Sequence, residues 1–415
     1  MQFFKKRNRE GVEHDKKSNL DIPLLIVIVT LSIFGVLMVY DGSVIVAVRQ
    51  GHDPNFYFIK QAMWTIMGFM AMYVFYRIDY HFLGKISFPL IIFSVFLLIL
   101  VLIVNHDNDI KRWMDLGPFD LQPSEVAKFS LLIYLSSWLS KQRDQVGDLN
   151  EKIKFHFKHE LLPFLLILGS VCGLILIEPD MDTTIMLGVT SFIVYFLSGN
   201  DRIHLIGSIA VGLLTTIMVT IATIAAKYRL SRLTNFIDFW RTGNIQNPLS
   251  EGYQFKQVLV AVASGGWFGL GFGQSRQKFL YLGETAFSDT IFAIVAEEFG
   301  LMGCILIVGL LAFVFYKGYK IAMKAPDKLG FLIAIAFTTW LVFQSILHIG
   351  SNVGMLPING NTLPFISYGG SSTLINLGAI GVLLNISKHQ KENTIERFER
   401  KERHENVVIK RLKKR

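Results

Sequence analysis

Three carboxylates stand in or beside an apolar stretch that is long enough to cross a membrane. Asp289 opens the run "DTIFAIVAEEFGLMGCILIVGLLAFVFY", and Glu297 and Glu298 lie inside it. Ionisable side chains are costly within a membrane and mark candidate functional sites. In a helix, Glu297 lies about 12 Å deeper than Asp289, and Glu298 points about 180° away from it. We therefore expect chemistry at Asp289, and we expect the two glutamates to face the bundle interior and bond to neighbouring helices.

The segment 227–288, which leads to Asp289, is unusually basic for an outer loop. It carries seven Lys or Arg residues against three Asp or Glu residues. Two interpretations stay open: the positive-inside rule weakens for long loops, or the loop binds an anion. Its stretch "SGGWFGLGFGQSRQ" suits tight turns and close approach of the backbone to a ligand. The cations considered for the anion are Arg229, Arg232, Arg276 and Lys278.

Two further groups of charged residues lie near predicted outer helix ends. In "LQPSEVAK", Glu125 and Lys128 are three residues apart, which puts them on one helical face where they can form an ion pair. Because ionisable residues are costly to bury in a membrane, we expect this pair to be functional and to shape a substrate cavity. The alternative interpretation is that Glu125 only stabilises the start of the helix while Lys128 reaches toward the membrane surface. Lys111 and Arg112 precede a tryptophan, so they are either anion ligands or interfacial anchors.

The stretch "LPINGNTLPFISYGGSS" (356–372) contains two prolines and three glycines, and it predicts a loop that dips back into the bundle. The hydroxyls of Ser367, Ser371 and Ser372 and the amides of Gly369 and Gly370 could cradle phosphate oxygens. Close packing of helix against helix explains the glycines equally well.

The elements that must position these residues are membrane helices. The 415 residues are 52% hydrophobic with a mean hydropathy of +0.44, which predicts an all-α, polytopic integral membrane protein. We expect a basic tail (1–20), a transmembrane domain (21–387) with a large extracytoplasmic loop (227–288) between its seventh and eighth helices, and a second basic tail (388–415). About ten spans are predicted, near 21–40, 59–77, 84–104, 123–140, 161–178, 182–198, 203–226, 289–316, 329–351 and 368–387.

Lysine and arginine in the tails and in the loops 141–160 and 317–328 place both termini in the cytoplasm. The first apolar run lacks a small-residue cleavage site, so we interpret it as a retained helix and not as a signal peptide. The net charge of +9 suits an anionic leaflet and requires no nucleic acid. Cys172 and Cys304 lie in apolar spans, which predicts neither a disulfide framework nor a cysteine metal site.

Four motifs, taken together, carry a family resemblance. "RQKFLYLGETAFSDTIFAIVAEEFGLMG", "LQPSEVAK", "LIEPDMDTTIML" and "LPFISYGGSS" look like those of the SEDS family (shape, elongation, division and sporulation), whose members include FtsW and RodA, and "SRQKFLYL" is more similar to the FtsW branch. The chain departs from the family at two places. The family stretch resembles Pro-Glu-Ala-His-Thr-Asp, whereas this chain has Phe287 and Ser288 before Asp289, so the histidine is absent; Asp182 stands where the family tends to have glycine.

The resemblance implies an inverting glycosyltransferase that polymerises lipid II at the outer face of the bacterial cytoplasmic membrane. It also implies pairing with a class B penicillin-binding protein and other divisome or elongasome proteins, at the division septum for the FtsW branch. A RodA-type elongation polymerase, a lipid II flippase and a non-enzymatic scaffold are the alternatives.

The residues suggest how such a reaction would be divided among them. Asp289 suits the general base that takes the sugar hydroxyl proton. The basic residues named above, with or without a divalent cation such as Mg²⁺ or Mn²⁺, would stabilise the leaving diphosphate. The sequence does not rank these cations.

Overall fold

The computed structural model is built almost entirely of helices and describes residues 20–104, 112–115, 117, 120–141, 154–199, 202–225, 227–243 and 251–389. The predicted tails therefore lie outside the described residues, except for positions 20, 388 and 389. Within these ranges nine helices are long and apolar enough to cross a membrane, which confirms the polytopic all-α fold. They are α2 (Ile22–Arg49), α3 (Phe56–Arg77), α4 (Tyr80–Val104), the π-helical turn η1 (Phe157–Leu161) continuing into α7 (Leu162–Ile177), α8 (Met181–Ser198), α9 (Arg202–Ala225), α13 (Ile291–Met323), α14 (Lys328–Asn352) and α15 (Gly370–Lys388).

The predicted span 123–140 also forms a helix, α5 (Pro123–Ser140), although it is not one of these nine. It packs against α4, α8 and α14, and nearly all of its side chains are buried. A helix surrounded by protein needs no apolar surface toward lipid, so α5 can carry charged residues within the bundle.

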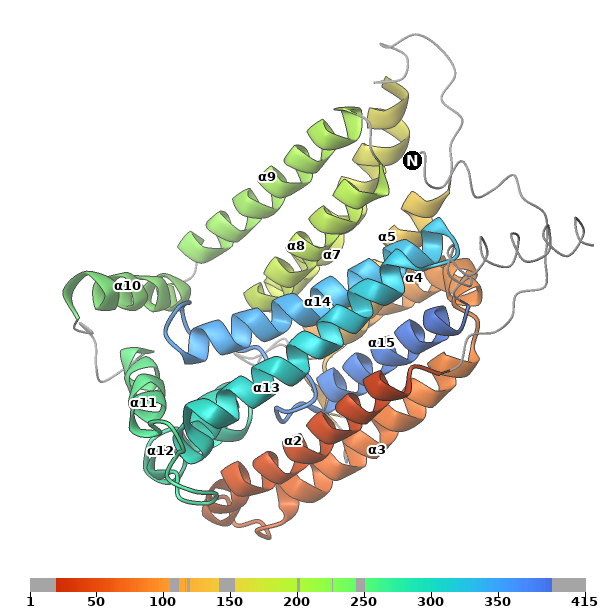
Figure 1. Cartoon of the computed structure of the whole chain (residues 1–415). Coiled ribbons are helices and arrows are strands. Elements are labelled where there is room, and N and C mark those ends of the chain that lie inside the picture. The colour runs from red at the N-terminus through yellow and green to blue at the C-terminus, as the bar shows by residue number, and fades with distance from the viewer. Residues whose placement is uncertain are drawn as a thin grey trace, which may run out of the picture.

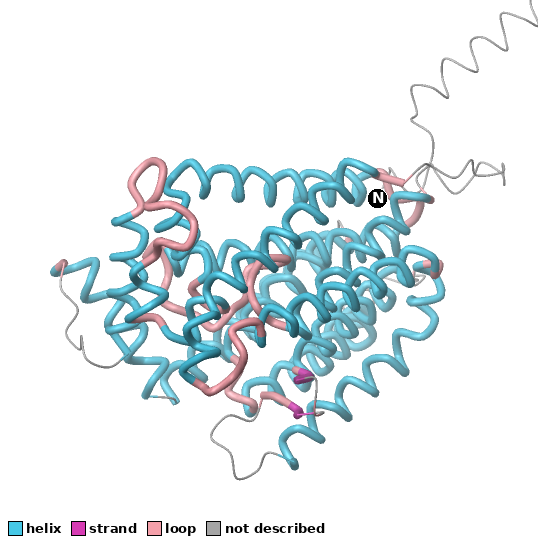
Figure 2. Tube along the Cα trace, turned by 90° about the horizontal axis from the view of Figure 1, so that it is seen from below, coloured by secondary structure: helices cyan, strands magenta, loops and turns pink. Residues whose placement is uncertain are grey.

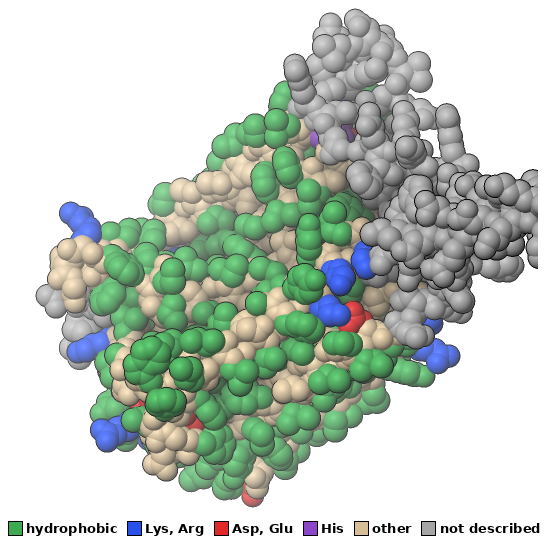
Figure 3. Space-filling view, in the orientation of Figure 1, with side chains coloured by type: hydrophobic (Ala, Val, Ile, Leu, Met, Phe, Trp, Pro, Cys, Tyr) green, Lys and Arg blue, Asp and Glu red, His purple; other side chains and the backbone are tan. Residues whose placement is uncertain are grey.

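The helices run back and forth between two ends of the molecule (Figure 1). One end, here the tail end, holds Leu20 and His389. The opposite end, the loop end, holds α10 (Lys227–Thr242) and α11 (Glu251–Ser264). Lys and Arg side chains gather at both ends of the face drawn in Figure 3, with hydrophobic side chains between them. This distribution matches a protein that faces lipid along its middle.

Helix α15 is the most enclosed span, whereas α9 is the most peripheral. The most apolar window of α15 is 89% buried, against 17% for α9. A Cβ atom at Gly381 of α15 would lie only 2.4 Å from the Met72 carbonyl oxygen of α3. Small residues therefore let α15 and α3 approach closely, as is usual for helices packed in a membrane.

The segment predicted as a long loop is largely helical where it is described. It comprises α10, α11, α12 (Arg276–Leu280) and the 3₁₀ turn η2 (Gly283–Phe287). A short antiparallel pair, β1 (Met114–Asp115) with β2 (Asp120–Leu121), lies before α5 (Figure 2).

The glycine-rich turn between α11 and α12 packs against the protein's own backbone. Gly269 has a φ of +79°, and a Cβ there would lie 2.1 Å from the Glu298 carbonyl oxygen. Opposite it, α13 is interrupted at Gly300, which has a φ of +65°. The Leu270 amide donates to the Glu297 carbonyl (2.9 Å), and the Leu301 amide donates to the Gly266 carbonyl (2.9 Å). The close approach that these glycines allow is thus between two protein segments, whereas the sequence predicted an approach to a ligand.

Candidate active site

Asp289 lies at the loop end, in the short connection between η2 and α13. Its carbonyl oxygen accepts a hydrogen bond from Asn352 Nδ2 of α14 (3.0 Å). The preceding carbonyl, of Ser288, accepts one from Ser367 Oγ (2.8 Å), in the loop that joins α14 to α15. The predicted return of that loop into the bundle is confirmed, and it holds the Asp289 backbone from a second side.

A second carboxylate, that of Asp182 in the first turn of α8, lies beside Asp289 across Gly360. Asp182 Oδ2 accepts a hydrogen bond from the Gly360 amide (2.9 Å). A Cβ at Gly360 would lie 3.7 Å from Asp182 Oδ2 and 3.8 Å from Asp289 Oδ2. Both carboxylates therefore face the same side of Gly360, where a Cβ would be in van der Waals contact with each of them.

This surrounding changes the acidity of Asp289. Burial, and then the negative charge of Asp182, raise the pKa of Asp289 to about 6 against the lowering effect of Arg232. A carboxylate with a pKa nearer to neutrality is a better proton acceptor than an ordinary aspartate and is still ionised at pH 7.

Arg232 of α10 and Arg112, just before β1, both interact electrostatically with Asp182 and Asp289. Arg112 is held on the turn before α8, where its Nε donates to the Glu178 carbonyl (3.2 Å) and its Nη2 to the Pro179 carbonyl. The Glu178 side chain is fully buried, and burial raises its pKa to about 9. Because Glu178 is then neutral at pH 7, the charge of Arg112 remains available to the two aspartates.

The other cations considered from the sequence have different surroundings. Arg229 is buried and donates from Nη1 to the Ala222 carbonyl (2.9 Å), near the end of α9. The side chain of Arg276 is exposed on α12, and Lys111 lies outside the described residues. Of this pool, the structure brings Arg112 and Arg232 to Asp289.

Lys278 is a correction to the predicted set of diphosphate ligands. Its side chain is buried, and its Nζ lies 2.5 Å from Asp41 Oδ2 of α2 and 2.5 Å from Glu298 Oε1 of α13. An ammonium already shared by two buried carboxylates is not free to bind a substrate anion. Lys278 therefore joins α12 to α2 and α13, and we do not assign it to the diphosphate.

Glu297 and Glu298 have the predicted structural role. Both are buried. Glu297 accepts hydrogen bonds from Ser275 Oγ and from the amide of Arg276 (3.1 Å), at the start of α12. Glu298 accepts one from the Ser275 amide (3.1 Å) in addition to its contact with Lys278. The pair inside the apolar helix thus holds the glycine-rich turn in place.

Glu125 and Lys128 form the predicted ion pair, with 2.8 Å between Nζ and Oε1, and both side chains are buried. Lys128 Nζ also lies 5.0 Å from the ring centroid of Trp340. Trp340 donates to Gln344 Oε1 (2.9 Å), and Gln344 Nε2 donates to the Thr362 carbonyl (2.9 Å). A continuous set of contacts therefore connects the ion pair to the loop that carries Gly360.

The serines predicted to cradle phosphate are used within the protein, which is a second correction. Ser371 Oγ accepts from the Gln122 amide (3.0 Å) and donates to the Asp120 carbonyl (3.1 Å). Ser372 Oγ shares a hydrogen bond with Thr362 Oγ1 (2.9 Å). Both side chains are buried, so we do not assign Ser371 or Ser372 to the diphosphate.

Asp182 is the site residue that the sequence reasoning missed. Its signal was present as the aspartate that replaces a family glycine in "EPDMDTT". The neighbouring Asp180 in the same motif has a structural role, because it caps α8 and accepts from Thr183 Oγ1 (2.8 Å) and Ser124 Oγ (3.0 Å).

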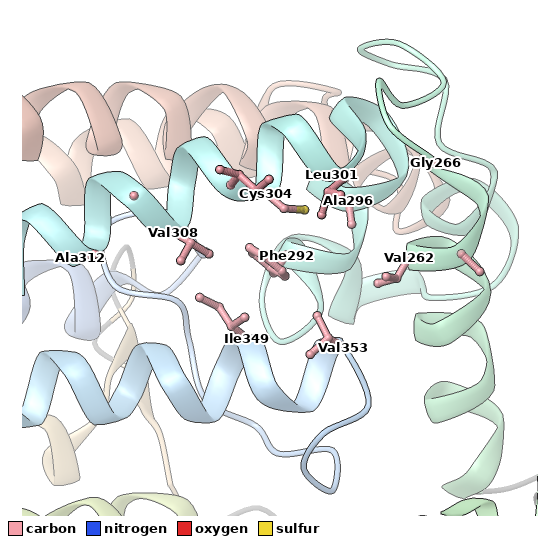
Figure 4. Close-up of a pocket in the computed structure, with 13 residues that line it drawn as sticks. Val262, Gly266, Phe292, Ala296, Leu301, Cys304, Val308, Ala312, Ile349 and Val353 are labelled. Carbon is pink, nitrogen blue, oxygen red and sulfur yellow. The ribbon is translucent and has the colours of Figure 1, made fainter.

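An apolar cavity of about 660 Å³ lies beside the start of α13. Figure 4 shows Phe292 and Cys304 of α13, Ile349 of α14 and Val262 of α11 among the side chains around it. Phe292, which lines this cavity, follows Asp289 by three residues in the chain.

The chain is similar to known proteins over most of its length. The profile of the FtsW/RodA/SpoVE family, described as cell cycle protein, matches residues 22–392. The probable peptidoglycan glycosyltransferase FtsW of Trichlorobacter lovleyi is 34% identical over 88% of this chain and 93% of its own length. Stage V sporulation protein E of Bacillus subtilis is 35% identical over 91% of this chain and 99% of its own length.

Two solved structures share the fold. A chain from work described as "Structural coordination of polymerization and crosslinking by a peptidoglycan synthase complex" aligns with a TM-score of 0.69, at 26% identity, over 90% of this chain and 99% of that one. The rod shape determining protein RodA of Thermus thermophilus aligns with a TM-score of 0.61, at 22% identity, over 90% and 98%. With the family profile and these relatives covering the same helices, the chain belongs to the FtsW/RodA/SpoVE family, which is the SEDS family that its motifs resemble.

Proposed function

We propose that this protein is a peptidoglycan glycosyltransferase that polymerises lipid II into glycan strands at the loop end of the bundle. The observation that carries the proposal is Asp289, a carboxylate with a raised pKa that lies beside Asp182 and within the electrostatic reach of Arg112 and Arg232. The names of relatives such as the T. lovleyi protein support the same activity.

In this mechanism a sugar hydroxyl of one substrate attacks the anomeric carbon of another, and the bond to the lipid diphosphate breaks. Asp289 takes the hydroxyl proton as the new glycosidic bond forms. Arg112 and Arg232 stabilise the negative charge that develops on the departing diphosphate. Attack from the face opposite the leaving group inverts the anomeric configuration.

Two groups at the site fit the remaining requirements of a lipid-linked substrate. Asp182 offers an oxygen ligand of the kind that Mg²⁺ or Mn²⁺ prefers, and a cation held there would help to neutralise the diphosphate while Asp289 acts as the base. The apolar cavity beside Phe292 suits part of the lipid chain, since its lining side chains are hydrophobic.

The topology completes the proposal. Both termini lie in the cytoplasm, the loop end faces outward, and the partner is a class B penicillin-binding protein of the divisome or elongasome. Similarity to the FtsW relatives supports a septal role. The equally similar sporulation protein makes a role in sporulation the alternative.

The test uses the purified full chain with its single-span transpeptidase partner, lipid II, and penicillin to block crosslinking. Wild-type protein should yield glycan polymer, whereas Asp289→Asn should form it about 10²–10⁴-fold more slowly. Lipid II flipping without polymer would replace the proposal with a transporter, and neither activity would indicate a scaffold.

A further inference from the structure

A second cluster of chemically active side chains lies at the tail end, remote in the fold from Asp289. His156 and Glu160 belong to the helical stem that leads into α7, and His204 belongs to the first turn of α9. One ligand atom from each of the three lies within 4.8 Å of the other two. His156 Nδ1 is 2.8 Å, and His204 Nε2 3.6 Å, from Glu160 Oε2.

His156 is buried, and both of its ring nitrogens have defined surroundings. Its side chain is only 2% exposed, and its Nδ1 lies 2.8 Å from Glu160 Oε2. Its other nitrogen, Nε2, is 2.8 Å from the Tyr195 hydroxyl of α8. Histidine ligands commonly use their second nitrogen in this way, because that hydrogen bond fixes the tautomer and the ring orientation.

We propose that His156, Glu160 and His204 bind a transition-metal ion of the Zn²⁺ class, with water as the fourth ligand. Two imidazoles and one carboxylate favour such an ion over Mg²⁺ or Ca²⁺. Ligands on one tetrahedral ion stand about 3.3 Å apart when their bonds are about 2.0–2.1 Å long. Small side-chain rotations therefore bring these three atoms onto one ion.

The local fold supports this assignment. Glu160 lies in the π-helical turn η1, a rare element that is frequent at functional sites. Gly199 leaves space for the His204 ring, because a Cβ at position 199 would lie 2.4 Å from that ring. The charge of Lys328 also acts on Glu160, so a divalent ion at this site would bind near a second positive charge.

A metal at this position would tie α9 to the α7 stem. Helix α9 is the least buried span, and it leads directly into α10, which carries Arg232. The ion would thus hold the first turn of α9, the helix that precedes α10 and its Arg232. This consequence rests on the proposed function, whereas metal binding itself does not.

Metal binding can be measured without any activity assay. We expect purified full-length protein to retain one Zn²⁺ per chain after dialysis, by elemental analysis, and its melting temperature in detergent to rise with added Zn²⁺ and fall with chelator. Co²⁺ in place of Zn²⁺ should give the visible absorption of a tetrahedral site. His156→Gln and His204→Gln should lose the bound metal, with monodispersity checked by size exclusion.

His159→Ala is the matched control, since His159 is on the same stem but its Nδ1 lies 3.1 Å from the Phe155 carbonyl of its own helix. This variant should bind metal like the wild type. Absence of retained metal and of a Zn²⁺-dependent thermal shift in the wild-type chain would overturn the proposal, as would equal binding by the folded His204→Gln protein. Loss of metal in the His159→Ala variant would place the site elsewhere on the stem.

Discussion

Replacing Asp182 by asparagine should move the pH dependence of catalysis to lower pH. The change keeps an oxygen that can accept the Gly360 amide but removes the negative charge next to Asp289. Burial is the largest cause of the raised pKa of Asp289, and the charge of Asp182 is the second. Removing only the second cause should therefore lower the pKa from about 6 by part of the rise above 3.8, and we expect about one unit.

The consequence for rate follows from the ionised fraction of Asp289. At pH 5 a base with a pKa of about 6 is about 9% ionised, whereas one with a pKa of about 5 is about half ionised. Relative to its own high-pH plateau, Asp182→Asn should thus be about fivefold more active at pH 5 than the wild type. The sign is fixed, because a base works only when it has lost its proton.

The assay is lipid II polymerisation by the complex with its partner, measured as kcat/KM from pH 4.5 to 8. Asp115→Asn is the control, because Asp115 is an exposed carboxylate bonded to the Gly117 amide in the same region before α5. An acid limb of Asp182→Asn that coincides with that of the wild type, or lies above it, would refute the electrostatic coupling of the two aspartates. A lower plateau with the shifted limb would add a substrate or metal role for Asp182.

Four other outcomes are expected. Asp289→Asn should slow polymerisation by about 10²–10⁴-fold without loss of folded protein, and a wild-type rate would contradict its role as the base. Lys278→Met leaves the carboxylates of Asp41 and Glu298 unpaired, so the free energy of unfolding should fall by about 3–5 kcal/mol; an unchanged melting temperature in detergent would argue against the buried triad. Lys128→Met should destabilise the protein more than Lys128→Met combined with Glu125→Gln, because the single change leaves one buried charge alone; equal melting temperatures would show that the pair is not coupled. Activity without the transpeptidase partner should be low, because a partner that packs against the loop end can change the arrangement of the segment 227–288, and equal rates for the isolated chain and the complex would contradict this regulation.

The sequence alone determined the features that depend on local periodicity and on solvent. Apolar runs of membrane length predicted the spans, because lipid forces each run to satisfy its own backbone hydrogen bonds. The spacing of three between Glu125 and Lys128 predicted their ion pair, since it puts both side chains on one face of a helix. The position of Asp289 at the start of an apolar run likewise placed it at a helix end, at the edge of the membrane.

Only the tertiary structure decided which distant residues meet. Lys278 pairs with Asp41, 237 positions away, and Asp182 meets Asp289 through a glycine of a third segment. His204 joins His156 and Glu160 because α8 returns the chain to the tail end. No local pattern encodes these contacts, because they follow from how the helices pack against one another. A charge that looks available in the sequence, such as that of Lys278, can therefore be neutralised in the folded protein by a partner that only packing supplies.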